Sequence, residues 1–208
     1  MEDILELYQQ PYDPKRPLVG MDETSKQMIG ETRSRIPAQV GRVERYDYEY
    51  KRNGVSNIFM FFDPLGGWRH VKVTDHRTKA DWAYCMQELV DIHYPKAEVI
   101  RVVMDNLNTH NPAALYEVFE PAKAKRILSK LEFHNTPVHG SWLNVAEIEL
   151  SVLSRQCLSR RIPDKDTLTR EAAAWEADRN GAGTKVDWRF TTADARIKLK
   201  HLYPSIHE

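Results

Sequence analysis

The chain has 208 residues, a formal net charge of zero, 41% hydrophobic residues and 29% charged residues, which is ordinary for a folded globular domain. No apolar run approaches the roughly 18 residues needed to span a membrane, and the acidic, polar N-terminus does not resemble a signal peptide. The neutral charge gives no global sign of nucleic-acid binding, and Cys85 and Cys157 are too few for a disulfide framework.

The first half of the chain is predicted to be rich in strands. Residues 1–16 look like an extended arm or a leftover linker, and the apolar stretch 18–22 is predicted to be a short buried strand. Residues 24–45 are polar, basic and marked by Pro and Gly, which indicates a loop. Two runs of strand formers follow at 57–62 and 68–73, and the turn sequence between them predicts a β-hairpin.

The second half of the chain is predicted to be mostly helical, with two further strands. Helical spacing of apolar residues predicts a helix over 78–94, and the near-continuous apolar run 99–104 predicts a strand in the middle of a sheet. Residues 131–136 are predicted to form another strand. Further helices are expected at 112–130, 142–158, 163–180 and 191–203. This order of elements predicts a mixed α/β sheet flanked by helices, with extra helices at the C-terminus.

Basic residues gather locally although the chain is neutral overall. The clusters lie within 33–45, 123–130, 155–161 and 196–201. Such clusters can follow a phosphate backbone. Taken one by one, however, such clusters are more often solvated helix faces.

Two aspartates stand where ligands usually bind in α/β sheets. Asp22 ends the first predicted strand, and Asp105 ends the strand at 99–104. The carboxyl ends of such strands form ligand sites, so the two side chains would face one crevice if their strands were neighbours. Two bare carboxylates there repel each other unless a cation neutralises them, and hard oxygen ligands suit Mg²⁺ or Mn²⁺. Taken alone, each is also compatible with an ordinary turn residue.

A third acid is expected from the helix predicted at 142–158, which offers Glu147 and Glu149. At about 100° per residue the two side chains point roughly 160° apart, so one helix face cannot present both. Glu147 borders the apolar stripe, beside Asn144 and Ser151, and can reach a site over the sheet edge. Glu149 falls on the opposite side and is expected to have a structural role.

With these acids in order, the chain resembles the catalytic domain of DDE transposases of the mariner superfamily, most closely the bacterial insertion sequence 630 family. The motifs that carry the resemblance are VGMDET around Asp22, VVMDNLNTH around Asp105 and HGSWLNVAEIE around Glu147. The stretches YEYKRNGVSNIFMFFDPLGGWR and RRIPDKDTLTREAAAWEADRN are also typical of that family. The resemblance covers residues 17–204, and it departs from many relatives at Trp142, where they carry Pro-Asp before Leu-Asn.

The resemblance implies an RNase H-like fold and phosphoryl transfer with two divalent ions, Mg²⁺ or Mn²⁺. Two such ions about 3.5–4 Å apart clamp a scissile phosphate and stabilise the attacking and leaving oxygens. Asp105 would bridge both ions, with Asp22 and Glu147 each completing one side. The groups expected behind these ligands or facing DNA are Asn106, Asn108, His110, Trp142 and Asn144. For His110, a turn histidine bonded to the backbone is an equally good interpretation.

Three segments are expected: residues 1–16 as an arm or linker remnant, 17–160 as the catalytic core and 161–208 as a helical extension packed on it. Transposases of this family carry N-terminal helix-turn-helix domains, for which residues 1–16 leave no room. A truncated, split or free-standing catalytic domain is therefore expected.

The expected activity is that of a metal-dependent endonuclease and strand transferase acting at transposon ends. The expected partners are transposon-end and target DNA, a separate helix-turn-helix polypeptide and a second copy of the chain, and not a membrane. The expected location is the bacterial cytoplasm, on the nucleoid when bound to DNA. The alternatives are a catalytically idle remnant that inhibits a full-length transposase, and a stand-alone RNase H-like nuclease.

Overall fold

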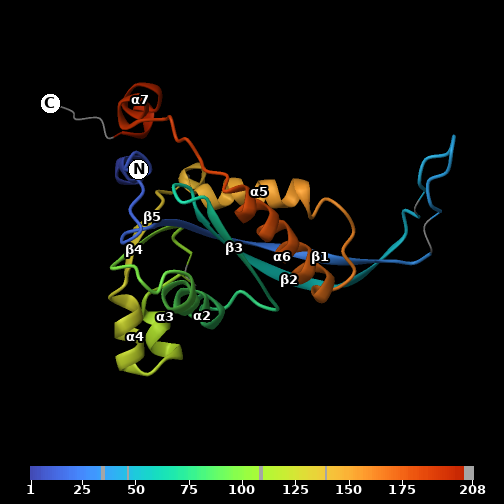
Figure 1. The fold of residues 1–208 in the computed structure, drawn as a ribbon, viewed down its shortest axis with the longest axis horizontal. Coiled ribbons are helices and arrows are strands. Elements are labelled where there is room, and N and C mark those ends of the chain that lie inside the picture. The colour runs from blue at the N-terminus through green and yellow to red at the C-terminus, as the bar shows by residue number, and fades with distance from the viewer. Residues whose placement is uncertain (34–35, 46, 108–109, 139, 204–208) are drawn as a thin grey trace.

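A five-stranded mixed sheet lies at the centre of the molecule, between two layers of helices (Figure 1). The computed structural model describes the whole chain except residues 34–35, 46, 108–109, 139 and 204–208. The strands are β1 (Leu18–Glu31), β2 (Tyr50–Asp63), β3 (Trp68–Thr74), β4 (Ile100–Met104) and β5 (Leu131–Asn135). Their order is β3-β2-β1-β4-β5, with β1, β2 and β3 antiparallel and β4 parallel to both of its neighbours. The predicted mixed sheet is therefore confirmed.

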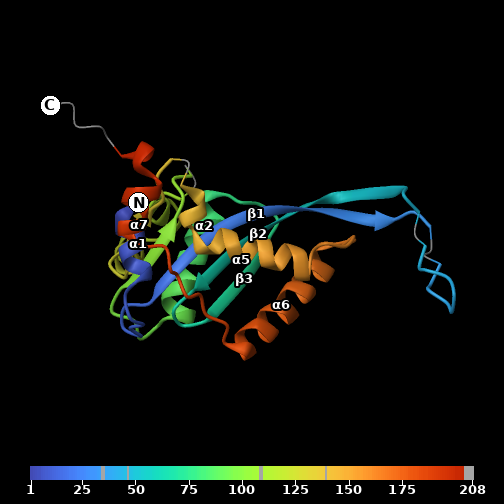
Figure 2. The ribbon, with the colours of Figure 1, turned by 90° about the horizontal axis from the view of Figure 1, so that it is seen from above.

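Helices cover both faces of this sheet. One face carries α2 (Lys79–Glu88) with a π-helical turn at Leu89–His93, α3 (Ala113–Val118) and α4 (Pro121–Leu128). The other face carries α5 (Val145–Gln156), which packs on β1 and β2, and α6 (Lys165–Ala182), which packs on β3 (Figure 2). None of the helices in the described part of the chain is long and apolar enough to cross a membrane.

The central strands divide the core between these two layers by alternation. In β2, Phe59 and Phe61 belong to the apolar cluster under α2, α3 and α4, whereas Ile58 and Met60 belong to the cluster under α5 and α6. A strand that is buried on both faces has a continuous apolar sequence. This is why the strand predictions at 57–62 and 99–104 are confirmed.

β1 and β2 extend well beyond the predicted strands. The prediction of a loop at 24–45 is wrong for its first part, because β1 continues to Glu31, which pairs with Tyr50 of β2. The two strands project from the body as a long antiparallel arm (Figures 1 and 2). Residues 50–55 are all exposed, so no apolar alternation marks them as strand. Main-chain hydrogen bonds hold this part of the arm together, and a hydrophobic pattern cannot report them.

The N-terminal segment contains a helix, so the prediction of an extended arm is wrong for residues 2–8. This helix, α1 (Glu2–Tyr8), buries four of its seven residues and lies beside α7 (Thr192–Lys198) at one end of the molecule (Figure 1). Both helices pack into a third apolar cluster with residues of β1, β2 and β4. A helix this short is stabilised by packing rather than by its own sequence, which explains the missed prediction. The division into segments 1–16, 17–160 and 161–208 stays a prediction.

The C-terminal helices begin close to the predicted positions. The side chain of Asp164 accepts a hydrogen bond from the amide of Thr167 and caps α6, which ends at Gly183 with a φ of 57°. α7 begins with the predicted capping box, in which Thr191 and Asp194 each accept a hydrogen bond from the other's amide. Local capping chemistry was therefore a reliable guide to where these helices begin.

Candidate active site

Asp22 and Asp105 project from neighbouring strands onto one face of the sheet. β1 and β4 are paired in parallel as far as Gly20 and Val103, and each aspartate follows two residues later. Met21 packs in the cluster under α2, so alternation turns Gly20 and Asp22 toward α5, and Asp105 follows Val103 onto the same side. The condition that the two strands are neighbours is met.

The first turn of α5 supplies Glu147. Asn144 caps the helix: its Oδ1 accepts a hydrogen bond from the amide of Ala146 (3.1 Å), and its Nδ2 donates to the carbonyl of Met21 (2.9 Å). The start of α5 is thereby tied to the residue that precedes Asp22 in β1. Glu147 follows in the first turn, where the free helix amides favour a carboxylate. Asn144 is 1% exposed, and its hydrogen bonds hold the start of the helix on β1.

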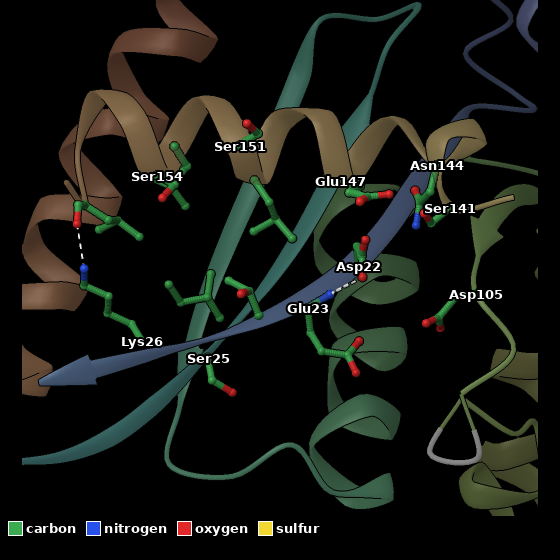
Figure 3. A pocket seen from close by; sticks show the side chains of 15 residues that line it. Asp22, Glu23, Ser25, Lys26, Asp105, Ser141, Asn144, Glu147, Ser151 and Ser154 are labelled. Carbon is green, nitrogen blue, oxygen red and sulfur yellow. Dashed lines mark hydrogen bonds between the residues drawn. The ribbon is translucent and has the colours of Figure 1, made fainter. Parts of the chain in front are cut away.

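Asp22, Asp105 and Glu147 line one pocket of about 490 Å³. Figure 3 shows the three acids at one end of this pocket, with Ser151, Ser154 and Lys26 toward the other end. The pocket therefore runs along α5 from the acids to a stretch of hydroxyl groups.

The electrostatics of the pocket are unbalanced. Burial raises the pKa of Asp22 to about 7; the hydrogen bond from the amide of Glu23 opposes this rise, and the charges of Asp105, Glu23 and Glu147 add to it. No ion pair within the described residues involves Asp22 or Glu147. Excess negative charge in a partly buried pocket is unfavourable, and a bound cation would neutralise it.

The donor set fits a hard divalent cation, since carboxylate oxygens are the ligands that Mg²⁺ and Mn²⁺ prefer. The residues that would hold it are Asp22, Asp105 and Glu147. Among the described residues, no three His, Cys, Asp or Glu side chains are close enough together to hold an ion as they stand.

His110 lies between Asp105 and a fourth acid, Glu23. Its Nδ1 is 2.8 Å from Oδ1 of Asp105, and its Nε2 is 2.8 Å from Oε2 of Glu23. The second contact is at ion-pair distance but is not aligned as a hydrogen bond. The ring of Trp82 stacks on the imidazole, with centroids 6.2 Å apart. These carboxylate contacts decide against a turn histidine whose ring bonds to the backbone.

These contacts determine the protonation states of His110 and Asp105. Burial lowers the pKa of His110, but its contacts with Asp105 and Glu23 outweigh burial and raise that pKa to about 9. Burial raises the pKa of Asp105, yet the contact with His110 holds it below its ordinary value. His110 is therefore a buried cation at neutral pH, and Asp105 is a carboxylate.

The other predicted residues lie around the pocket. Nδ2 of Asn106 donates to the carbonyl of Thr136 (3.0 Å), which ties the loop after β4 to the end of β5. Trp142 is 38% exposed, stacks on Trp188 and lines a shallow neighbouring pocket that also contacts Glu147. Asn108 lies outside the described residues. The side chain of Trp142 is therefore accessible to solvent beside the active-site pocket, whereas the side chain of Asn106 makes a hydrogen bond that holds two loops together.

Glu149 is buried on the side of α5 that faces away from the pocket. It is 3% exposed, and its Oε1 accepts hydrogen bonds from Nη2 of Arg179 (3.0 Å) and from Nε of Arg69. The helical geometry correctly separates the two glutamates, with Glu147 at the pocket and Glu149 in a buried ion pair. The catalytic role of Glu147 stays a prediction.

Sequence reasoning missed Glu23 and Lys26. Lys26 lies in the part of β1 that was predicted to be a loop, and Glu23 lies between the predicted strand and that loop. Asp22 and Glu23 leave the strand in opposite directions (Figure 3), as neighbours in any strand do. The two adjacent acids were visible in the sequence, but their opposite directions can be inferred only once the strand is known to continue past Asp22.

Comparisons with known proteins bear on this site and fold. The sequence profile of a family described as DDE superfamily endonuclease matches residues 17–169. No curated protein matches the chain. A crystal structure of the Mos1 mariner paired-end complex with Mn matches with a TM-score of 0.57 and 15% identity, covering 88% of this chain and 55% of that chain.

Two further structures share the fold. The Mos1 transposase paired-end complex with left transposon end matches with a TM-score of 0.57 and 13% identity, covering 88% of this chain and 56% of that chain. A simian T-cell lymphotropic virus intasome in complex with the PP2A regulatory subunit B56 gamma matches with a TM-score of 0.52 and 8% identity, covering 96% and 59%.

This chain thus spans just over half the length of each of these three chains. At these identities the likeness shows the fold, and the predicted RNase H-like fold is confirmed. The family profile matches well over half of the sequence and includes all three acids of the pocket. The chain therefore belongs to the DDE superfamily endonuclease family.

Proposed function

We propose that this chain is the catalytic domain of a transposase, which cleaves and joins DNA strands at transposon ends with Mg²⁺ or Mn²⁺. The observation that carries the proposal is the meeting of Asp22, Asp105 and Glu147 in one pocket, although each comes from a different element. Family membership and the fold shared with two Mos1 paired-end complexes support DNA as the substrate. The three intact acids favour an enzyme over an idle remnant.

In the proposed mechanism, Asp22, Asp105 and Glu147 would hold two divalent ions. When bound, such ions stabilise charge on the scissile phosphate and lower the pKa of the attacking water or 3′-hydroxyl. Asn144 keeps Glu147 over β1 through its bond to Met21. The hydroxyl groups farther along α5 are placed to contact the DNA backbone, which positions a strand without reading its bases.

The finer assignments belong to the same proposal. The three motifs favour the insertion sequence 630 family within the mariner superfamily. Two of the similar structures are paired-end complexes, which supports a second copy of this chain and two DNA ends as partners. A separate helix-turn-helix polypeptide and a location in the bacterial cytoplasm, on the nucleoid, complete the proposal.

A strand-cleavage assay tests this proposal. The substrate is a labelled duplex carrying the terminal inverted repeat that flanks the gene, with a random duplex as comparison. We expect cleavage at the repeat end in Mn²⁺ or Mg²⁺ and none in EDTA. Asp105→Asn should reduce the rate at least about 100-fold, the order of loss when one group stabilising the transition state is removed.

The alternatives give different results in the same assay. A stand-alone nuclease would cut the random duplex as fast as the repeat duplex. A protein that cuts neither duplex with any divalent ion, while still binding them, would contradict the proposal and favour the inhibitor.

A further inference from the structure

We infer that Glu23, acting through His110, is a positioning residue that fixes the carboxylate of Asp105 in the active site. The inference rests on the proposed function, because it takes Asp105 as a ligand of the catalytic ions. Glu23 leaves β1 in the direction opposite to Asp22 (Figure 3). The imidazole ring of His110 lies between Glu23 and Asp105 and contacts both carboxylates.

The two oxygens of Asp105 have different surroundings. Oδ1 is 2.8 Å from Nδ1 of His110 and also accepts a hydrogen bond from the amide of Leu107 (3.3 Å). Oδ2 accepts no hydrogen bond from any residue that the structure describes, and 35% of the Asp105 side chain is exposed. One oxygen is therefore held by the protein while the other remains open toward the pocket, as a metal ligand requires.

Glu23 and Trp82 in turn hold the imidazole ring. The side chains of His110 and Glu23 are each 1% exposed, and their contact spans 2.8 Å. Trp82 is fully buried and stacks on the ring with an interplanar angle of 25°. The ring is thus fixed by an acid at its Nε2 edge and by an indole on its face, so it offers Nδ1 to Asp105 in one direction.

Stability does not explain this arrangement. A buried ion pair costs desolvation that its attraction often fails to repay, and apolar residues of similar size commonly replace such a pair without loss. The second acid adds one more buried charge that a merely stable core does not need. A role in orienting Asp105 accounts for both buried charges.

The test measures Mn²⁺ affinity of the whole chain by electron paramagnetic resonance, without DNA and without turnover. Glu23→Gln keeps the shape of the side chain and removes its charge. We expect Mn²⁺ binding about 10- to 100-fold weaker than wild type, as for other residues that orient a ligand. Glu149→Gln is the matched control: it breaks a buried ion pair away from the pocket, so it should lower the melting temperature and leave Mn²⁺ affinity unchanged.

Two further variants keep the inference open to contradiction. Glu23→Asp replaces Glu23→Gln if the latter does not fold, and it should weaken Mn²⁺ binding in the same way. The double variant of Glu23→Gln with His110→Gln should lose less Mn²⁺ affinity than the two single variants lose together, because part of the effect of Glu23 passes through the ring. Additive losses, or a Glu23→Gln affinity within about twofold of wild type with only the melting temperature lowered, would overturn the inference. If the wild-type chain binds Mn²⁺ but does not cleave DNA, the proposed function fails, whereas the comparison of Mn²⁺ affinities still tests the role of Glu23.

Discussion

At Asp22 a carboxylate is buried beside three other acids. Its ordinary pKa of 3.8 is raised to about 7 by burial and by the neighbouring charges. Between about pH 4 and pH 7 the folded chain therefore keeps a proton that the unfolded chain releases. It follows that the free energy of unfolding falls as the pH rises through this window and stays low above it.

Asp22→Asn should remove this penalty in the metal-free protein. One pKa unit corresponds to about 1.4 kcal/mol, so the full shift is worth about 4 kcal/mol, and solvent screening of the partly exposed carboxylate reduces this to roughly 2–4 kcal/mol. At pH 8 in EDTA we expect the variant to melt about 4–10 °C above wild type. At about pH 3 the difference should nearly vanish, because Asp22 is then largely protonated in both states. A variant that melts below wild type at pH 8 would show that the charge is favourably paired.

The residues of the site were predictable to different degrees. The motifs placed Asp22, Asp105 and Glu147 correctly in one pocket, since strand ends and one helix face suffice to bring them together. The contact of His110 with Glu23 could not be foreseen, because it joins a residue after β4 to the continuation of β1 past Asp22. Predicting it required the length of β1, which the sequence pattern understated.

At the level of elements, β1 and α5 touch at a point where no side chain fits. A Cβ atom at Gly20 would lie 2.6 Å from Cγ2 of Val145 and 3.1 Å from the amide nitrogen of Ala146. The same contact brings Asn144 to its bond with the carbonyl of Met21. The absence of a side chain at Gly20 thus sets how close Glu147 comes to the strand that carries the aspartates.

Gly20→Ala should push the start of α5 away from β1. Overpacking of this kind costs about 1–3 kcal/mol, and we expect a lower urea midpoint together with slower DNA cleavage. Gly181→Ala is the control, because a Cβ atom there meets nothing within 4 Å and lies in α6. That change should leave stability equal or raise it by about 0.5–1 kcal/mol. Unchanged stability of Gly20→Ala would contradict the close contact of β1 with α5.

Elements with a buried apolar pattern were predictable from the sequence. The exposed part of the arm, which main-chain hydrogen bonds hold, and the short helix α1 were not. The apolar pattern predicts β2 only from residue 57, although the strand begins at Tyr50, because residues 50–55 are exposed. It misses α1 because a seven-residue helix is too short to show a period. Pattern reasoning reports burial, so the polar arm and the short docked helix escaped it.

At the scale of the whole molecule, the charge is neutral, so the proposed DNA contacts would come from local basic clusters. Phosphate contacts release counterions, so affinity should fall with rising salt. For two to four such contacts we expect binding to a random duplex to weaken on the order of 10- to 100-fold between 50 and 200 mM salt. Fluorescence anisotropy at several salt concentrations measures this slope, and a flat slope would contradict backbone binding.

The central claim is that the three acids of one pocket, including Glu147 and not Glu149, carry out DNA strand cleavage. The most direct test is single-turnover cleavage by Glu147→Gln and Glu149→Gln, two identical changes two residues apart on α5. Both reactions are run at a temperature where each variant is folded, since loss of the buried Glu149 charge costs about 3–5 kcal/mol of stability. The account predicts a rate at least about 100-fold below wild type for Glu147→Gln and a rate close to wild type for Glu149→Gln. An active Glu147→Gln beside an inactive, folded Glu149→Gln would contradict it.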